Sequence, residues 1–253
     1  MDTPSNSDRF DHALIAGRLH KAKQEIESLS GNRSVKLLAV TKTVPVEVIN
    51  YAIDELGIDA IGENRVQELL SKYDSLHKPR SGKLEIHLIG SLQTNKVKYI
   101  IDKVDMIESV DSLKLAAEID RQAKKHSLTM DILIEVNSGR EEQKGGVNPD
   151  ELLDFVEALK EFTSIRLRGL MTIAPRCEDR DDYLKYFGET RELFERIKSL
   201  KLDFIDSDRF DTLSMGMSGS YPEAIRAGST EIRLGSTIYG ARIYPEPLKN
   251  ENK

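Results

Sequence analysis

The feature that most constrains the fold is a regular alternation of short apolar strands and amphipathic helical segments. We expect eight strands, at residues 36–40, 60–62, 85–89, 106–109, 131–136, 168–172, 212–215 and 231–234. One strand with its following helix takes about 25 to 30 residues, as is typical of βα units. The repeat predicts parallel strands, because each helix returns the chain to the same edge of the sheet.

Residues that favour helix starts delimit the helical segments. Asp111 and Ser112 precede one helical pattern, and Asn148 and Pro149 precede another, with proline in the first turn. An extra helix at 8–29 comes before the first strand. The other helices are expected at 45–56, 65–73, 95–101, 112–126, 149–160, 181–200 and 221–227.

Eight such repeats predict a (β/α)8 TIM barrel with an extra N-terminal helix. A doubly wound open sheet is the alternative, but no Gly-x-Gly-x-x-Gly motif follows the first strand. No proline-, glycine- or serine-rich linker divides the chain, so we expect a single domain over residues 1–253. Its ends, 1–7 and 246–253, are expected to be frayed.

Composition and charge narrow the partners. Apolar residues make up 39% and charged residues 32% of the chain, and the formal net charge is −6, which gives no reason to expect binding to nucleic acid or an anionic membrane. No apolar run approaches the roughly 18 residues of a membrane span, and no signal peptide pattern begins the chain. Cys177 is the only cysteine, so an internal disulfide is excluded. We expect a cytoplasmic protein.

Lys42 is the first candidate functional residue. It follows a short apolar strand in the segment VKLLAVTKTVP (35–45). Lysine is costly to bury, so it either reaches solvent here or is kept for chemistry. Its amine can condense with an aldehyde to form a Schiff base. In a closed barrel, strand 1 lies beside strand 8, which would bring Lys42 to the ends of the last strands.

Two glycine- and serine-rich segments follow strands 7 and 8: TLSMGMSGS (212–220) and EIRLGSTIYG (231–240). Barrels often bind phosphate in these loops. Gly235 and Ser236 would open a short helix toward the anion, and Ser218 could add a hydroxyl. Tight βα turns would also favour these residues. A lysine beside a phosphate site points to pyridoxal 5'-phosphate (PLP).

Arg233 is the third element of this candidate site. Strand alternation places it on the face opposite Ile232 and Leu234. A guanidinium facing the barrel top needs an acceptor, which the pyridine nitrogen of PLP could supply. Arginine keeps its proton, so the nitrogen would stay unprotonated and the ring would be a weak electron sink. The alternative is an arginine that faces an exposed carboxylate.

Seven segments occur in this order along the chain: LLAVTKTVP (37–45), IGENRVQEL (61–69), HLIGSLQTNK (87–96), EEQKGG (141–146), RGLMTIAP (168–175), LSMGMS (213–218) and EIRLGSTIYGAR (231–242). Together they resemble the pyridoxal phosphate homeostasis protein family, and the resemblance runs from about residue 10 to Tyr244. It implies a single PLP-binding barrel, similar to the N-terminal domain of alanine racemase. It also implies a protein that buffers or delivers PLP to PLP-dependent apoenzymes, without an established turnover reaction.

The resemblance also implies roles for individual residues. Lys42 would hold PLP covalently as the internal aldimine. Asn64 would lie near the phenolic oxygen of the cofactor, and Arg233 would face the pyridine nitrogen. The other implied contacts are along the pocket and at the phosphate: Met171, Met215, Ser218, Gly235 and Ser236. Ser220 departs from the aspartate usual in the family, which puts a loop-stabilising contact in doubt.

Two other functions stay open. An amino-acid racemase would need a second base across from the lysine, for which Tyr221, Tyr239 and Tyr244 are the local candidates. A cofactor-free aldolase would use Lys42 on a sugar phosphate and would carry no chromophore.

The remaining polar motifs predict no catalytic residue. His87 fits a core histidine, and Lys96 and Lys144 fit surface lysines, although either amine could pass PLP on. No His, Cys and carboxylate cluster has metal-ligand spacing. Without a β-rich second domain, we expect a monomer.

Overall fold

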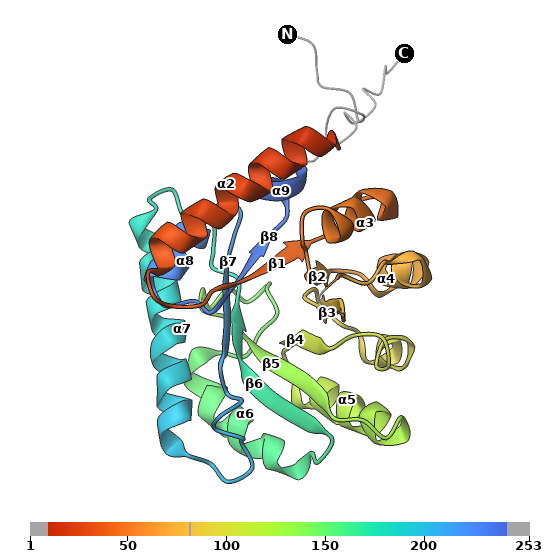
Figure 1. The fold of residues 1–253 in the computed structure, drawn as a ribbon. Coiled ribbons are helices and arrows are strands. Elements are labelled where there is room, and N and C mark those ends of the chain that lie inside the picture. The colour runs from red at the N-terminus through yellow and green to blue at the C-terminus, as the bar shows by residue number, and fades with distance from the viewer. Residues whose placement is uncertain (1–9, 81, 242–253) are drawn as a thin grey trace, which may run out of the picture.

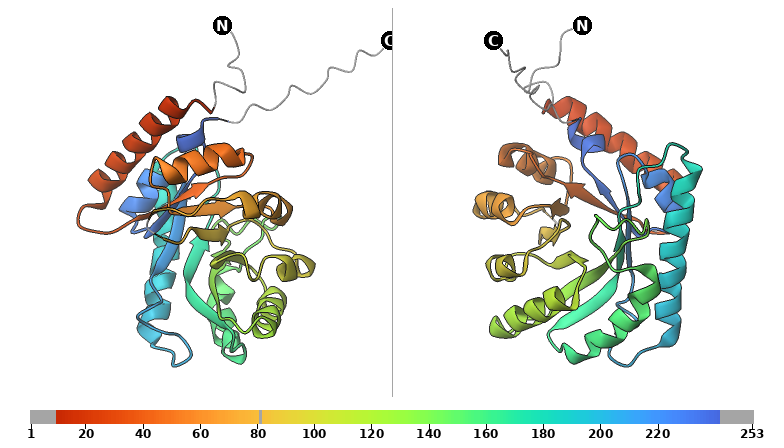
Figure 2. Two further views of the ribbon diagram at one scale, coloured as in Figure 1. Left: turned by 45° about the vertical axis from the view of Figure 1, so that its right-hand side comes forward. Right: turned by 180° about the vertical axis from the view of Figure 1, so that it is seen from behind.

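Eight parallel strands form a closed barrel in sequence order, with β8 paired to β1 (Figure 1). The computed structural model describes residues 10–80 and 82–241. The predicted barrel is confirmed, and the helices surround it on the outside (Figure 2). The strands are β1 (Lys36–Val40), β2 (Ala60–Glu63), β3 (Glu85–Leu88), β4 (Met106–Val110), β5 (Met130–Val136), β6 (Ile165–Thr172), β7 (Thr212–Met217) and β8 (Glu231–Leu234).

The helices follow the predicted order with local differences. The α-helices are α2 (His12–Ser30), α3 (Val46–Asp54), α4 (Val66–Lys72), α5 (Leu113–Lys125), α6 (Leu152–Ala158), α7 (Asp181–Leu200), α8 (Tyr221–Arg226) and α9 (Ser236–Tyr239). After β3, the segment expected to be an α-helix is instead a 3-10 helix, η2 (Thr94–Tyr99). The helix predicted at 149–160 is divided into η3 (Pro149–Glu151), α6 and η4 (Leu159–Glu161). The remaining 3-10 turn is η1 (Tyr73–Ser75).

Side-chain caps fix several helix starts. The Asp11 carboxylate accepts a hydrogen bond from the Leu14 backbone N–H at 2.8 Å, which starts α2. Ser112 caps α5, and Asn148 caps η3, as their positions in the sequence predict. Helix α2, the extra N-terminal helix, packs on α8 and α9 (Figure 1). It therefore covers the outside of the barrel where β8 and its neighbours end.

The apolar residues form an outer and an inner layer. A large cluster fills the space between the strands and the helices. Inside the barrel, two small clusters lie apart: Leu38, Val40, Ala60 and Ile89 form one, and Met106, Leu133 and Met171 form the other. Strands of parallel sheets are normally apolar on both faces. Polar side chains in the interior are therefore the exceptions that need an explanation.

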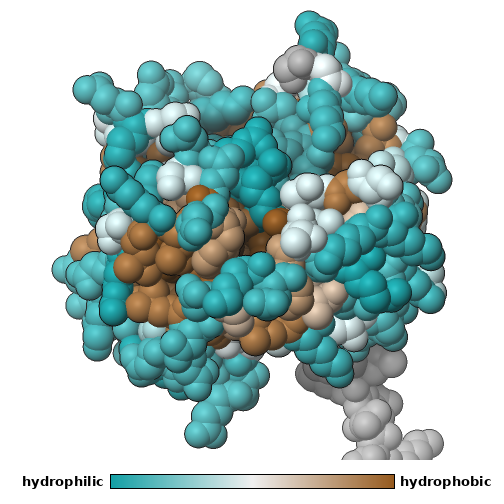
Figure 3. Space-filling view, turned by 90° about the horizontal axis from the view of Figure 1, so that it is seen from below, coloured by the Kyte–Doolittle hydropathy of each residue, from teal (hydrophilic) through white to brown (hydrophobic). Residues whose placement is uncertain are grey.

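The surface carries most of the charged residues. In the space-filling view of one side, hydrophilic side chains predominate, and hydrophobic ones gather in one area (Figure 3). Within residues 10–80 and 82–241, no helix combines the length and apolarity that crossing a membrane requires.

Candidate functional site

A cavity of about 510 Å³ opens where the strands end, in the size range of small-molecule sites. Its wall comes from the ends of several strands, which is where barrels of this kind usually place their functional sites. The lining residues are Val40, Lys42, Val44, Asn64, Ile89, Ile173, Met217, Ser218, Gly219, Arg233, Gly235, Ser236, Tyr239, Gly240 and Ala241. The fold thus joins the Lys42 segment to the two segments that follow β7 and β8.

Six of the eight expected cofactor contacts line this cavity. They come from the ends of β1, β2, β7 and β8, so distant parts of the chain meet at one place. They are Lys42, Asn64, Ser218, Arg233, Gly235 and Ser236. The pairing of β1 with β8 explains this, because it closes the barrel between Lys42 and Arg233.

Met171 and Met215, which were also expected to line the pocket, lie elsewhere. Both are fully buried and are absent from the cavity wall. Met171 packs lower in the barrel interior with Met106 and Leu133. Met215 belongs to the outer layer, because its neighbour Ser214 points inward.

Two residues further along the chain take these places in the wall. Ile173 and Met217 line the cavity, each two residues after an expected methionine. The register between β7 and β8 shifts between Ser214 and Met217, and Gly216 there has φ 91°. Such an irregularity changes which side chains face inward. A motif alone does not reveal it.

The backbone around Lys42 is held from outside the barrel. The ammonium of Lys72 donates a hydrogen bond to the Thr41 carbonyl at 2.9 Å. The Thr43 backbone N–H donates to the Glu68 carboxylate at 2.5 Å, and Lys72 also pairs with Glu68. Thr43 has φ 62°, an unfavourable conformation for a β-branched residue. These contacts hold the turn that presents Lys42 to the cavity.

The loops after β7 and β8 are tied together. The Thr237 backbone N–H donates to the Ser218 hydroxyl at 3.1 Å, which links the β7 loop to the start of α9. The Ser220 hydroxyl accepts a hydrogen bond from the Met217 N–H at 3.3 Å. Ser220 therefore makes a contact within the loop, at the position where the resemblance left one in doubt.

Arg233 is buried and bonded within the barrel. It is 3% exposed, and its guanidinium donates to the Ser214 hydroxyl at 2.6 Å and to the Thr172 carbonyl at 2.8 Å. Ser214 in turn donates to the Glu108 carboxylate at 2.7 Å. The alternative of an arginine facing an exposed carboxylate is wrong, because Glu108 has no exposed surface.

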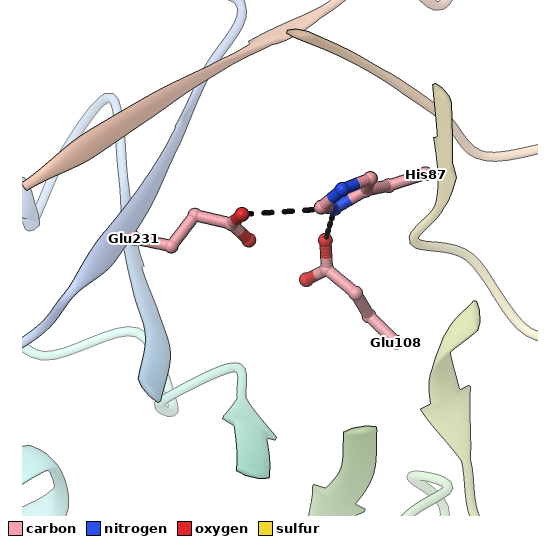
Figure 4. Close-up of side chains that lie close together, drawn as sticks. All are labelled: His87, Glu108 and Glu231. Carbon is pink, nitrogen blue, oxygen red and sulfur yellow. Dashed lines mark hydrogen bonds and ion pairs between the residues drawn. The ribbon is translucent and has the colours of Figure 1, made fainter. Parts of the chain in front are cut away.

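The polar chain continues from Glu108 toward the opposite end of the barrel. His87, Glu108 and Glu231 point toward one another from β3, β4 and β8 (Figure 4). The His87 ring contacts Glu108 at 2.6 Å through Nδ1 and Glu85 at 3.0 Å through Nε2. Lys36 completes the chain, 2.7 Å from Glu85. His87 is a bonded core histidine, as the sequence indicated.

Sequence spacing missed this cluster, since its members lie on separate strands. One side-chain nitrogen or oxygen atom from each of His87, Glu108 and Glu231 lies within 4.8 Å of the other two. One available signal was a charged residue in a short, fully buried strand pattern, as Glu108 is in MIESV. Another was Glu231, which shares the inward face of β8 with Arg233.

Burial and charge shift the pKa values of this cluster. Burial acts to lower the pKa of His87, but the charge of Glu231 and the bonds to Glu108 and Glu85 raise it to about 10. Burial and the charge of Glu108 raise the pKa of Glu231 to about 7. Although burial opposes ionisation of Glu108, its bond to His87 lowers its pKa. These interactions favour the protonated form of the imidazole.

The cavity has groups that suit a phosphorylated aromatic aldehyde. Lys42 supplies an amine, Arg233 a guanidinium, and Ser218 and Ser236 supply hydroxyls. The buried Oδ1 atom of Asn64 has no hydrogen-bond partner among the described residues, so a polar ligand would satisfy this side chain. The residues present therefore fit PLP.

The lysines and tyrosines that were considered for other roles differ in their positions. Lys96 stands over the ring of Tyr99 at 5.8 Å, and Lys144 pairs with Glu141. Tyr239 lines the cavity, whereas Tyr221 donates to Glu25 on α2 at 2.6 Å. Tyr244 lies outside the described residues.

Similar proteins share both the sequence and the fold. A family model described as alanine racemase, N-terminal domain, matches residues 17–243. A pyridoxal phosphate homeostasis protein of Aquifex aeolicus is 44% identical over 214 residues, which cover 85% of this chain and 90% of the relative. One from Haemophilus influenzae is 34% identical over 235 residues, or 91% of this chain and 97% of the relative.

Solved structures of similar sequence have the same fold. PipY of Synechococcus elongatus, with PLP bound, has a TM-score of 0.77 and 31% identity, covering 89% of this chain and 100% of that one. A protein of Bifidobacterium adolescentis described as unknown has a TM-score of 0.83 and 33% identity, covering 94% and 98%. The chain therefore belongs to the pyridoxal phosphate homeostasis protein family, whose fold is that of the alanine racemase N-terminal domain.

Proposed function

We propose that the chain binds PLP through a Schiff base on Lys42 and serves PLP homeostasis by buffering or delivering the cofactor. The observation that carries the proposal is that Lys42 and Arg233 line one cavity together with the loops of Ser218 and Ser236. An aldehyde, a ring nitrogen and a phosphate on one small molecule match these three features. The PLP-bound structure of a relative supports the same ligand.

Each residue has a proposed part in binding. Lys42 supplies the amine, and Asn64 lies near the phenolic oxygen. Ser218, with Gly235 and Ser236, binds the phosphate through hydroxyl and backbone N–H groups. PLP supplies an aldehyde and an electron-withdrawing ring. Arg233 donates to the pyridine nitrogen without protonating it, which keeps the ring a weak electron sink and favours storage over turnover.

A racemase is the second candidate, because Tyr239 lines the same cavity as Lys42. Burial raises the pKa of Tyr239, so the phenol is poorly suited to act as a base at neutral pH. A cofactor-free aldolase is the third candidate and predicts a colourless protein. We favour the homeostasis role, with PLP-dependent apoenzymes as recipients and with a cytoplasmic monomer as the working form.

The test is a visible absorption spectrum of the purified protein before and after borohydride, followed by peptide mapping. We expect a yellow protein whose reduced adduct lies on Lys42. An assay with D- and L-alanine then separates a carrier from a racemase. A colourless protein that takes up no added PLP would exclude the proposal and favour the aldolase.

A further inference from the structure

Behind Arg233, the polar chain inside the barrel has no direct place in the binding of PLP. It runs from Arg233 at the cavity floor, through Ser214 and Glu108, to His87 and then to Glu85 and Lys36 at the other end. Arg233, Glu108 and His87 are all at most 3% exposed. Buried charges are expensive and persist where they are paired and bonded. We therefore expect this polar chain of side chains to have a role that apolar residues could not perform.

We propose that Glu108 is the positioning residue of Arg233, and that a doubly protonated His87 supports it by balancing the carboxylates inside the barrel. This support would fix the guanidinium at the floor of the cavity before any ligand enters. The effect of this support on PLP binding rests on the proposed function. Its effect on the position of Arg233 is independent of that function.

The hydrogen-bond directions define the support. Two guanidinium nitrogens of Arg233 donate hydrogen bonds, one to the Thr172 carbonyl and the other to the Ser214 hydroxyl. The Ser214 hydroxyl must then donate its own proton, and it does so to Glu108. Glu108 Oε2 also lies 3.9 Å from the guanidinium. One carboxylate thus orients Arg233 both through Ser214 and through charge.

The geometry of His87 defines its protonation. Nδ1 lies 2.6 Å from Glu108 and Nε2 lies 3.0 Å from Glu85, so each ring nitrogen faces a carboxylate oxygen. An ionised carboxylate only accepts, so these two contacts favour donation from both nitrogens. The Lys36 ammonium lies 3.4 Å from Nε2, a longer contact than that of Glu85 with the same nitrogen. Glu231 adds a further carboxylate 3.6 Å from Nδ1. The raised pKa of His87 agrees with this arrangement.

An imidazolium offsets negative charge inside the barrel. Glu108 and Glu231 are buried, whereas the side chains of Lys36 and Glu85 at the end of the polar chain are 35% and 40% exposed. A cationic His87 therefore faces the carboxylate of Glu108, and that of Glu231 when it is ionised, in a region of low dielectric. Glu135 on β5 is a further carboxylate, and its charge interacts with Glu108 and Arg233.

A bound divalent cation is the competing occupant of the same cluster. The buried oxygens of Glu231 have no hydrogen-bond partner among the described residues, which would suit a metal. However, Lys36 lies 3.7 Å from Glu231 and 3.4 Å from His87, so a second cation there would be repelled. The observations therefore favour the proton.

The experiment begins with the protein free of PLP. NMR exchange with solvent is measured for the Arg233 guanidinium protons in the wild type, in Glu108→Gln and in Asp131→Asn. Asp131 is the matched control, a mostly buried carboxylate that pairs with Arg166 and Arg168 instead. We expect exchange to become about tenfold faster in Glu108→Gln, from the loss of a charge-assisted bond, and to stay unchanged in Asp131→Asn.

The same variants are then titrated with PLP. We expect the dissociation constant to rise about tenfold in Glu108→Gln and not in Asp131→Asn. If Glu108→Gln does not fold, Ser214→Ala gives the same test with a smaller change. Wild-type exchange and affinity in a folded Glu108→Gln or Ser214→Ala would overturn the proposal.

Two further outcomes separate a failure of the proposed function from a failure of this inference. A wild type that takes up no PLP contradicts the proposed function, while the exchange measurement still tests the position of Arg233. Mn²⁺ or Zn²⁺ that raises the melting temperature of the wild type, but not of Glu231→Gln, would overturn the assignment of a proton to this cluster.

Discussion

Two lysines at opposite ends of β1 illustrate how the two ends of the barrel differ. Lys36 begins β1 at one end, where its amine lies 2.7 Å from Glu85 and 3.7 Å from Glu231. Lys42 follows β1 at the other end, in a cavity whose described lining includes no carboxylate. The same residue type thus has two settings: Lys36 pairs with carboxylates, and Lys42 lines the cavity in which we propose that PLP binds.

Replacing Lys42 with alanine is expected to have the largest effect. The visible absorbance of bound PLP and the borohydride adduct should be lost, because the amine that condenses with the aldehyde is absent. Lys36→Ala is the matched control and should keep both signals. Absorption spectroscopy with circular dichroism for the fold measures this. Normal absorbance in Lys42→Ala, with PLP on another lysine, would contradict the comparison between the two ends.

Arg233→Gln should have the second-largest effect. The variant leaves Glu108 buried beside an uncharged group, so the free energy of unfolding should fall by about 3–5 kcal/mol. PLP affinity should also fall. We choose glutamine because a glutamate would place a second carboxylate beside Glu108. Denaturant unfolding and PLP titration test this, with Arg166→Gln as the control, and equal stability of the two variants would count against a supporting role for the interior chain.

His87 should make stability depend on pH. Its folded pKa of about 10 lies above the ordinary value of 6.5. A raised pKa contributes stability that is fully present below about pH 6.5 and is lost as the pH rises through 10. The free energy of unfolding should therefore fall between these values in the wild type, and this dependence should be weaker in His87→Gln. Identical pH profiles would show that the ring is neutral.

Lys36→Met should have the smallest effect. Its side chain is 35% exposed, and solvent screens its pair with Glu85, so the loss should be about 1 kcal/mol or less. PLP affinity should stay within about twofold, a difference under 0.5 kcal/mol. Denaturant unfolding and titration measure both. A loss of PLP binding as large as that of Lys42→Ala would mean that the two ends are not functionally separate.

Much of the barrel could be predicted from local patterns. β1, β8 and α7 have the predicted bounds, because apolar runs and amphipathic periods are local properties. The helix expected after β3 is a 3-10 turn instead, where tertiary packing outweighs a weak local preference. The position of a residue in the cavity wall was predictable where it lies close after the end of a strand, as Lys42 and Gly235 do.

What the sequence by itself determined is the repeat of strands and helices, the candidate amine and the loops around it. The tertiary structure alone decided that Met217 and Ile173 replace Met215 and Met171 in the cavity wall, because a register shift in β7 and depth in the barrel are not local properties. It also decided that Glu108 and His87 lie behind Arg233, since only closure of the barrel brings β3, β4 and β8 to one axis.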